Sequence, residues 1–184
     1  MSHALLVMDM QNGIVERFSD ECAPLIDTIA SALDAAHRAS VQVIFVRVAF
    51  RDGAPEVSPR NKSFSALANL QAMAEDGPTT QVHSDLAVEP GDVIVTKRRV
   101  SAFAGSDLDV VLRAKGIDSL VLSGIATSGV VLSTIRQAAD LDFGITVLSD
   151  ACLDADAEVH RVLMEKVFPR QANVMTVHEW VAQL

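Results

Sequence analysis

Residues 120–134 read Leu-Val-Leu-Ser-Gly-Ile-Ala-Thr-Ser-Gly-Val-Val-Leu-Ser-Thr, an apolar run that breaks at a glycine and then continues. Its first half is a short run of branched apolar residues, which predicts a buried strand rather than a long helix. The run breaks at Gly124 and resumes with helical spacing, so we expect a tight turn that leads into a helix. Parallel α/β proteins place their chemistry at such turns, because the unpaired N–H groups of the helix point at the buried end of the strand.

The same alternation of strand and helix runs along the whole chain. We expect strands at 4–8, 41–49, 93–96, 119–123, 145–148 and 173–177. We expect helices at 24–39, 64–73, 131–140, 154–168 and 178–183, and one more that Ser106 or Asp107 caps and Gly116 stops. Either Asp154 or Asp156 caps the helix that follows the fifth strand. Residues 50–61 contain two prolines and no hydrophobic period, which predicts a loop of the length that often serves as a lid. The pattern predicts one domain over 1–184, with an α/β fold: a three-layer α/β/α sandwich around a mainly parallel, Rossmann-like sheet.

The composition excludes several classes of partner. The formal net charge is -9, so the chain lacks the basic stripe that nucleic-acid phosphates require. Cys22 and Cys152 lie in unrelated contexts, which favours neither a disulfide framework nor a zinc site and makes a reducing compartment the default. No apolar run approaches the ~18 residues that a membrane span needs. We therefore expect a cytoplasmic protein that binds neither nucleic acid nor membrane.

Three chemically useful features come directly after predicted strands. They are Asp9, Lys97 and the turn from Gly124 to Val130. Because the carboxyl ends of parallel strands share one edge of the sheet, we expect these features to converge. A carboxylate at this edge can act as a general acid or base, and a nearby lysine can stabilise an anion. A purely structural ion pair explains the same two residues equally well.

Three separated segments resemble the signatures of the isochorismatase-like hydrolases, the superfamily that includes nicotinamidases and N-carbamoylsarcosine amidases. The segments are Val-Met-Asp-Met-Gln-Asn at 7–12, Lys-Arg-Arg-Val-Ser-Ala-Phe at 97–103 and Gly-Ile-Ala-Thr at 124–127. They stand in the family's order, at compatible spacings, over nearly the whole chain. In that family an Asp, a Lys and a Cys form the catalytic set. The resemblance implies that Asp9 and Lys97 hold the first two places, and that a non-proline cis peptide near Ile125 and Ala126 brings N–H groups to an oxyanion hole.

The resemblance fails at the nucleophile. Counted from Gly124 along the family's Gly-x-x-Thr-x-x-Cys pattern, the cysteine position falls on Val130, which can neither attack nor donate. Thr127 or Ser128 could supply an alcohol only beside a positioned base, and turn hydroxyls more often bond to the backbone. Cys152 follows a predicted strand and could approach the site, but we expect it to be a small core residue.

The resemblance also indicates which residues surround a substrate. We expect binding of the substrate or its oxyanion by Ile125, Ala126, Thr127, Gly129, Phe103 and Arg51. Arg60 and Asn61 share the loop of Arg51 and could read a substrate carboxylate with it, although a solvated loop is the simpler explanation. Family members that hold a metal use Asp and His residues in the loop after the second strand. Here that loop offers Asp52 and Glu56 and no histidine, so we expect no metal and no cofactor.

Three functions remain open. The first is a hydrolase that acts on a small molecule without a cysteine nucleophile, using Asp9 and Lys97 as acid and base to cleave a vinyl ether or C–N bond. The segment 97–103 resembles the cysteine-free isochorismatase branch, whereas 126–128 is closer to the cysteine amidohydrolases. The second is an inactive pseudoenzyme that binds a small molecule or a protein partner. The third is an enzyme of neither kind, in which Asp9 activates water directly. We also expect a homo-oligomer.

Overall fold

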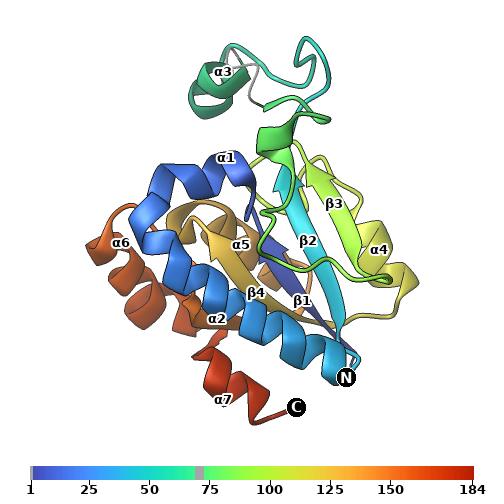
Figure 1. Ribbon diagram of the computed structural model, residues 1–184, viewed down its shortest axis with the longest axis vertical. Helices are drawn as coiled ribbons and strands as arrows, with labels where there is room; N and C mark the ends of the chain where they lie inside the picture. The colour runs from blue at the N-terminus through green and yellow to red at the C-terminus, as the bar shows by residue number, and fades with distance from the viewer. Residues whose placement is uncertain (1, 69–72) are drawn as a thin grey trace.

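The computed structural model describes residues 2–68 and 73–184, and its centre is a six-stranded sheet (Figure 1). The strands are β1 (His3–Met8), β2 (Gln42–Val48), β3 (Val93–Lys97), β4 (Ser119–Ile125), β5 (Gly144–Leu153) and β6 (Asn173–Met175). Their order in the sheet is β3-β2-β1-β4-β5-β6, and every neighbouring pair is parallel. The predicted parallel, Rossmann-like sheet is therefore confirmed.

Helices cover both faces of the sheet. The helices are α1 (Asn12–Val15), α2 (Ser19–Arg38), α3 (Lys62–Ala68), α4 (Leu108–Ala114), α5 (Leu132–Asp140), α6 (Ala157–Val162) and α7 (Val177–Val181). Shorter helical turns are η1 (Glu16–Phe18), η3 (Pro78–Thr80), η4 (Thr127–Val131), η5 (Leu163–Val167) and η6 (Phe168–Arg170). In the described part of the chain, no helix has the length and apolar character to cross a membrane.

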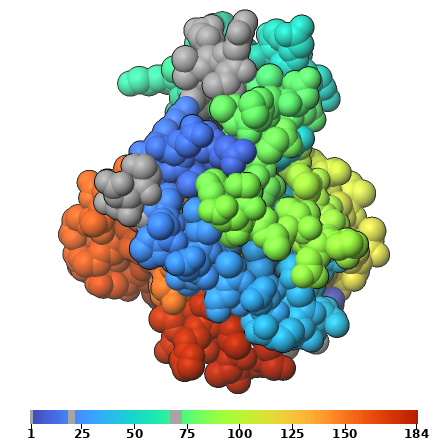
Figure 2. Space-filling view, viewed as in Figure 1, coloured from blue at the N-terminus to red at the C-terminus, as the bar shows by residue number. Residues whose placement is uncertain are grey.

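Two apolar layers separate the sheet from its helices. Alternate residues of β1 enter opposite layers: Leu6 packs with residues of α4 and α5, and Leu5 packs with residues of α2 and α7. This alternation is what a strand buried on both faces requires. Figure 2 shows α2 and α7 covering one face, together with the chain that leads from η3 toward β3. The three-layer sandwich follows directly from strands that are apolar on both sides.

A lobe projects beyond the carboxyl ends of the strands (Figure 1). It contains the irregular segment 50–61, as predicted, and α3. Phe50 and Phe64 make an edge-to-face contact with their ring centroids 5.6 Å apart, and they share a small apolar cluster with Val48 and Met73. The helix expected at 64–73 is present as α3, which begins earlier than predicted, and residues 69–72 lie outside the described part of the chain.

The fifth strand differs from its prediction. It was expected to end at 148, but β5 continues to Leu153 because the pairing with β4 shifts register. Val147 lies opposite Leu122, and the next partner, Cys152, lies opposite Gly124. The residues between them form a bulge that contains the polar Ser149, which ended the apolar run in the sequence. The extension carries the chain after β5 to the end of β4.

The strand order reverses direction between β1 and β4. From β1 the chain moves outward to β2 and β3, and then returns to the other side of β1 to build β4, β5 and β6. In open parallel sheets, ligands bind at the carboxyl ends of the strands where such a reversal occurs. Asp9 follows β1 here, and Gly124 lies beside Met8 in the register of β1 with β4. The topology thus places both features at one crevice.

Gly124 should be intolerant of any side chain. Its φ is +126°, and a Cβ built on it would lie 1.9 Å from the carbonyl oxygen of Met8, a backbone atom of a core strand that cannot give way. We therefore expect Gly124→Ala to lower the free energy of unfolding by about 4 kcal/mol or more, measured by urea denaturation. Gly129→Ala is the control, because its new Cβ would meet nothing closer than 3.8 Å. An unchanged urea midpoint for Gly124→Ala would contradict this account.

Candidate active site

The core of the candidate site is a buried ion pair. The Lys97 ammonium lies 3.0 Å from Oδ2 of Asp9, with the side chains 2% and 9% exposed. Neighbouring strands are about 4.8 Å apart, and β2 lies between the strands that carry these residues, so the long lysine side chain spans the end of β2. Lys97 also donates to the carbonyl oxygen of Arg99 at 3.0 Å. The expected convergence of the two residues is therefore observed.

The backbone at Asp9 directs its carboxylate across the sheet edge. Asp9 has φ of +57°, in the left-handed region that aspartate tolerates better than most residues with a Cβ. Its N–H donates to the carbonyl oxygen of Val46 at 2.8 Å, which ties the turn to β2. The chain thus leaves β1 sharply, and the side chain meets Lys97 rather than solvent.

Burial shapes the charge of Asp9. Its Oδ1 atom is buried and has no hydrogen-bond partner in the described part of the chain. Burial raises the pKa of Asp9, and this effect outweighs the charge and the hydrogen bond of Lys97, which both lower that pKa. Asp9 is therefore easier to protonate than an exposed aspartate. Its free Oδ1 is the atom that can carry the proton.

The turn after β4 lies beside Asp9. The peptide bond between Ile125 and Ala126 is cis, as the resemblance implies, and η4 follows at once. The N–H of Gly129 donates to the carbonyl oxygen of Ala126 at 3.1 Å. This donor is therefore used within the turn. Val130 is 2% exposed and belongs to the same apolar layer as Phe103. Val130, which the resemblance placed at the family's nucleophile position, is thus a buried apolar residue.

Thr127 has a partner that sequence reasoning missed. Its hydroxyl oxygen lies 2.8 Å from Nδ1 of His160, whereas turn hydroxyls more often bond to the backbone. The two residues are 33 positions apart, and no local pattern connects them. Only the pairing of β4 with the extended β5 brings them together.

The segment that carries Phe103 is fixed against α5. The N–H of Ala102 donates to the hydroxyl oxygen of Thr134 at 3.0 Å. The ring of Phe103, which is 7% exposed, packs against Phe143 with centroids 5.8 Å apart. Phe103 is therefore a rigid apolar wall near the end of β3.

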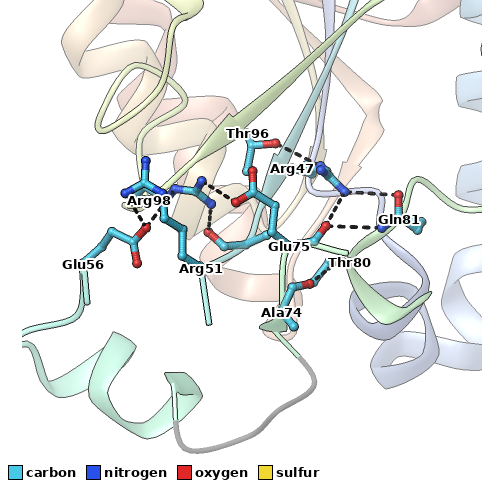
Figure 3. A network of polar contacts seen from close by, with 10 residues as sticks. Arg47, Arg51, Glu56, Ala74, Glu75, Thr80, Gln81, Thr96 and Arg98 are labelled. Atoms are coloured by element: carbon cyan, nitrogen blue, oxygen red, sulfur yellow. Dashed lines mark hydrogen bonds and ion pairs between the residues drawn. The ribbon is translucent and has the colours of Figure 1, made fainter. Parts of the chain in front are cut away.

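Arg51 lies apart from the other candidate residues. It pairs with Glu56 at 3.1 Å and is 67% exposed. It lines a charged cleft of about 690 Å³ together with Arg47, Asp52, Glu75, Asp76 and Gln81. Figure 3 shows four of these residues, Arg47, Arg51, Glu75 and Gln81, within one network of polar contacts. Arg47 bonds to Thr96, so its side chain leaves the sheet on the face opposite to that of the next residue pair, Val48 and Lys97. The part of Arg51 in substrate binding stays a prediction.

The loop after β2 is where family members that hold a metal have their Asp and His ligands. Glu56 lies 3.1 Å from a guanidinium nitrogen of Arg51 and 3.6 Å from one of Arg98, so its charge is already balanced. Across residues 2–68 and 73–184, no group of three or more His, Cys, Asp or Glu side chains is arranged to hold a metal ion.

Cys152 is unsuited to replace the missing nucleophile. It is 5% exposed, and burial raises the pKa of its thiol to about 12. At neutral pH almost none of it is the reactive thiolate. Cys152 is a core residue beside Gly124, as its apolar surroundings in the sequence predicted.

The protein is an α/β protein with an open parallel sheet. A buried Asp–Lys pair and a cis-peptide turn lie where the strand order reverses, and together they form a hydrolase-like site. The chain belongs to the isochorismatase family, because the model of the Isochorismatase domain matches residues 3–179. This chain is 34% identical to YwoC of Bacillus subtilis (strain 168), an uncharacterized isochorismatase family protein. The match covers 98% of this chain and 93% of YwoC.

Two further relatives support the assignment. The ureidoacrylate amidohydrolase RutB of Stutzerimonas stutzeri (strain A1501) is 34% identical over 98% of this chain and 79% of its own length. The crystal structure of a cysteine hydrolase from Pseudomonas syringae pv. phaseolicola 1448A superposes with a TM-score of 0.91, at 27% identity, and covers 98% of this chain and 91% of that one. The fold and the family are therefore established together.

Removal of the lysine charge should destabilise the protein in a pH-dependent way. Lys97→Met leaves the Asp9 carboxylate buried without a counter-ion, which we expect to cost about 3–5 kcal/mol of unfolding free energy at pH 8. The pKa of Asp9 is raised in the folded state, so the folded state takes up a proton as the pH falls, and the loss should shrink at pH 5. Urea denaturation at both pH values measures this.

Two controls accompany that measurement. Asp9→Asn in the Lys97→Met background removes both charges and should recover most of the stability. Arg113→Met breaks an ion pair with Asp109 in which both side chains are largely exposed, and it should leave the urea midpoint unchanged. Equal stability of Lys97→Met and the unmodified protein at pH 8 would show that the buried pair is not held as described.

Proposed function

We propose that this chain is a hydrolase that cleaves a vinyl ether or C–N bond of a small molecule without a covalent thiol intermediate. The observation that carries the proposal is Asp9, a buried carboxyl group with a raised pKa and with Lys97 on one oxygen. Its other oxygen, Oδ1, has no hydrogen-bond partner among the residues that the structure describes. A carboxyl group whose pKa is raised by burial takes up a proton more readily than an exposed one, which suits Asp9 to act as a general acid.

The proposed reaction needs only this pair and water. Protonated Asp9 gives its proton to the carbon of a vinyl ether, or to the leaving nitrogen of a C–N bond. Water adds to the electron-poor carbon and releases one proton, which returns to Asp9. In the C–N case the bond to the protonated nitrogen then breaks. In the vinyl-ether case the remaining hydroxyl group gives its proton to the leaving oxygen as the C–O bond breaks, which leaves a carbonyl compound and an alcohol. The Lys97 ammonium stabilises the carboxylate that Asp9 becomes during the transfer.

The turn and its neighbours are the proposed walls of the substrate site. The backbone of Ile125, Ala126 and Thr127 would face the oxygen on which negative charge develops, because the N–H groups of Ser128 and Gly129 already donate to Asp154 and Ala126. Phe103 would contact the apolar part of the substrate. RutB is named for the cleavage of an amide, which makes a C–N bond one of the two proposed targets. The homo-oligomeric state and the cytoplasmic location expected from the sequence stay predictions.

One observation favours a second candidate. Val130 occupies the family's nucleophile position and is almost completely buried, so the site lacks the thiol on which its cysteine-using relatives depend. A protein that binds a small molecule or a partner without turnover would show the same residue. The two candidates differ in what they predict for Asp9 and for a restored thiol.

Asp9→Asn should abolish most of the activity. We expect kcat/KM to fall by about 10²-fold or more, because the amide cannot donate the acid's proton. In the unmodified protein the rate should fall as the pH rises through the pKa of Asp9, which burial places above its ordinary value of 3.8. A panel of vinyl ethers, N-carbamoyl acids and simple amides, followed from pH 4 to pH 9, provides the measurement. The exposed Asp140→Asn is the matched control, and full activity in Asp9→Asn would refute the acid role.

Val130→Cys tests whether the site keeps the architecture of its thiol-using relatives. We expect the new thiol to react with iodoacetamide faster than free cysteine at neutral pH and to form a covalent adduct with an activated ester, both detected by mass spectrometry. Cys152 is an internal control, because its pKa of about 12 should keep it unlabelled in the folded protein. An inert thiol at position 130 would favour the binding protein over the hydrolase.

A further inference from the structure

We propose that Asp154 and His160 are positioning residues that hold the η4 turn in place from the far side. Together with their partners Ser128 and Thr127 they form a two-point contact that we call the turn latch. Its meaning for catalysis rests on the proposed function, because the turn carries the oxyanion-binding backbone and the position of Val130. The hold on the turn itself is a structural property that can be measured without any substrate.

The first point of the latch is a charge-assisted hydrogen bond. Oδ2 of Asp154 accepts from the N–H of Ser128 at 2.6 Å, and Asp154 is only 8% exposed. The sequence left Asp154 and Asp156 as alternative caps of the next helix. The structure assigns that task to Asp156, whose Oδ1 accepts from the N–H groups of Glu158 and Val159. Asp154 is therefore available for the turn, and a hydrogen bond to a carboxylate is about twice as strong as a neutral one.

The second point is the bond between Thr127 and His160. The two atoms are 2.8 Å apart, and Thr127 is completely buried. Burial lowers the pKa of His160, while the charge of Asp154 raises it to a smaller extent, so the ring is mainly neutral at neutral pH. In one neutral form the threonine hydroxyl donates to Nδ1, and in the other Nδ1–H donates to the hydroxyl oxygen. The contact persists in both.

The location of the latch gives it a function. It holds two consecutive residues, Thr127 and Ser128, that stand between the cis peptide bond and Val130. Asp154 directly follows β5, and His160 lies in the next helix, α6. The pairing of Leu153 with Ile125 brings this part of the chain next to the turn. Two contacts from one rigid support prevent the turn from rotating. Since a displacement of about 1 Å can cost 10²-fold in rate, such a hold matters for the backbone groups that face a substrate.

The same geometry offers a competing use. A hydroxyl 2.8 Å from an imidazole nitrogen has the arrangement of a nucleophile and its base, and Thr127 could then form an acyl-enzyme. The complete burial of Thr127 and the separate Asp9–Lys97 pair favour positioning. The experiment therefore has to distinguish a hold on the backbone from covalent chemistry.

Amide hydrogen exchange on the full chain, followed by NMR, tests the hold directly. Thr127→Val keeps the shape and removes the hydroxyl, and Asp154→Ala removes the acceptor. Each should speed exchange at the amides of Ser128 and Gly129 by about tenfold or more, and leave the β1 amides unchanged. Thr127→Ser retains the hydroxyl group and Asp154→Asn retains an acceptor oxygen. In both variants the exchange rates at Ser128 and Gly129 should stay within about threefold of those in the unmodified protein. Unchanged exchange in both disruptive variants would overturn the latch.

Two further readouts separate positioning from a general loss of stability. The ¹⁵N signal of His160 Nδ1 should shift in Thr127→Val and return in Thr127→Ser. On any substrate found in the panel, His160→Leu should lower kcat by about 10-fold or more with KM nearly unchanged, and His160→Asn, whose amide reaches the place of Nδ1, should recover most of that loss.

The outcomes keep the latch distinct from the proposed function. If the unmodified protein hydrolyses nothing in the panel, the proposed function fails, and the exchange result alone decides the latch. If an activated ester leaves an acyl group on Thr127, positioning is overturned in favour of a threonine nucleophile. Faster exchange at the turn, with no adduct on Thr127, supports the latch in either case.

Discussion

The ion pair between Asp9 and Lys97 sets the constraints on this molecule. A buried pair of charges persists only when its geometry is good, because each charge has lost its water. Here the geometry requires β1, β2 and β3 to keep one register, since the lysine reaches across the end of the middle strand. It also requires the left-handed backbone at Asp9. Once these are fixed, the pairing of β1 with β4 brings the cis-peptide turn to the same place.

Much of this arrangement could be predicted because the ends of the strands are visible in the sequence. An apolar run that stops at Asp9, at Lys97 or at Gly124 marks a strand terminus, and parallel strands share their carboxyl edge. The sandwich and the crevice follow from that pattern. The alternatives left open for Asp154 and Asp156 could not be settled in this way, because both are acids in the right place for a cap. Only the three-dimensional partners decide between them.

What sequence reasoning missed depends on contacts between distant segments. The apolar run of β5 is interrupted by Ser149, and a bulge that resumes pairing further along has no local signature. The bond from Thr127 to His160 exists because of that bulge. The place of Arg51 could not be foreseen for another reason, because an irregular loop gives no register. The alternation of side chains along β2 sends the neighbouring Arg47 to the opposite face from Lys97.

The isopropyl group of Val130 has a consequence for the conditions under which the protein could work. A catalytic thiolate is the group in a hydrolase that peroxides and disulfides attack first, and its oxidation stops turnover. A carboxyl group paired with an ammonium has no such oxidation chemistry, and the thiol of Cys152 is kept protonated by its burial. If the site works as proposed, it therefore lacks the group that oxidants attack. Peroxides that inactivate a catalytic thiolate would then leave the Asp9–Lys97 pair unchanged.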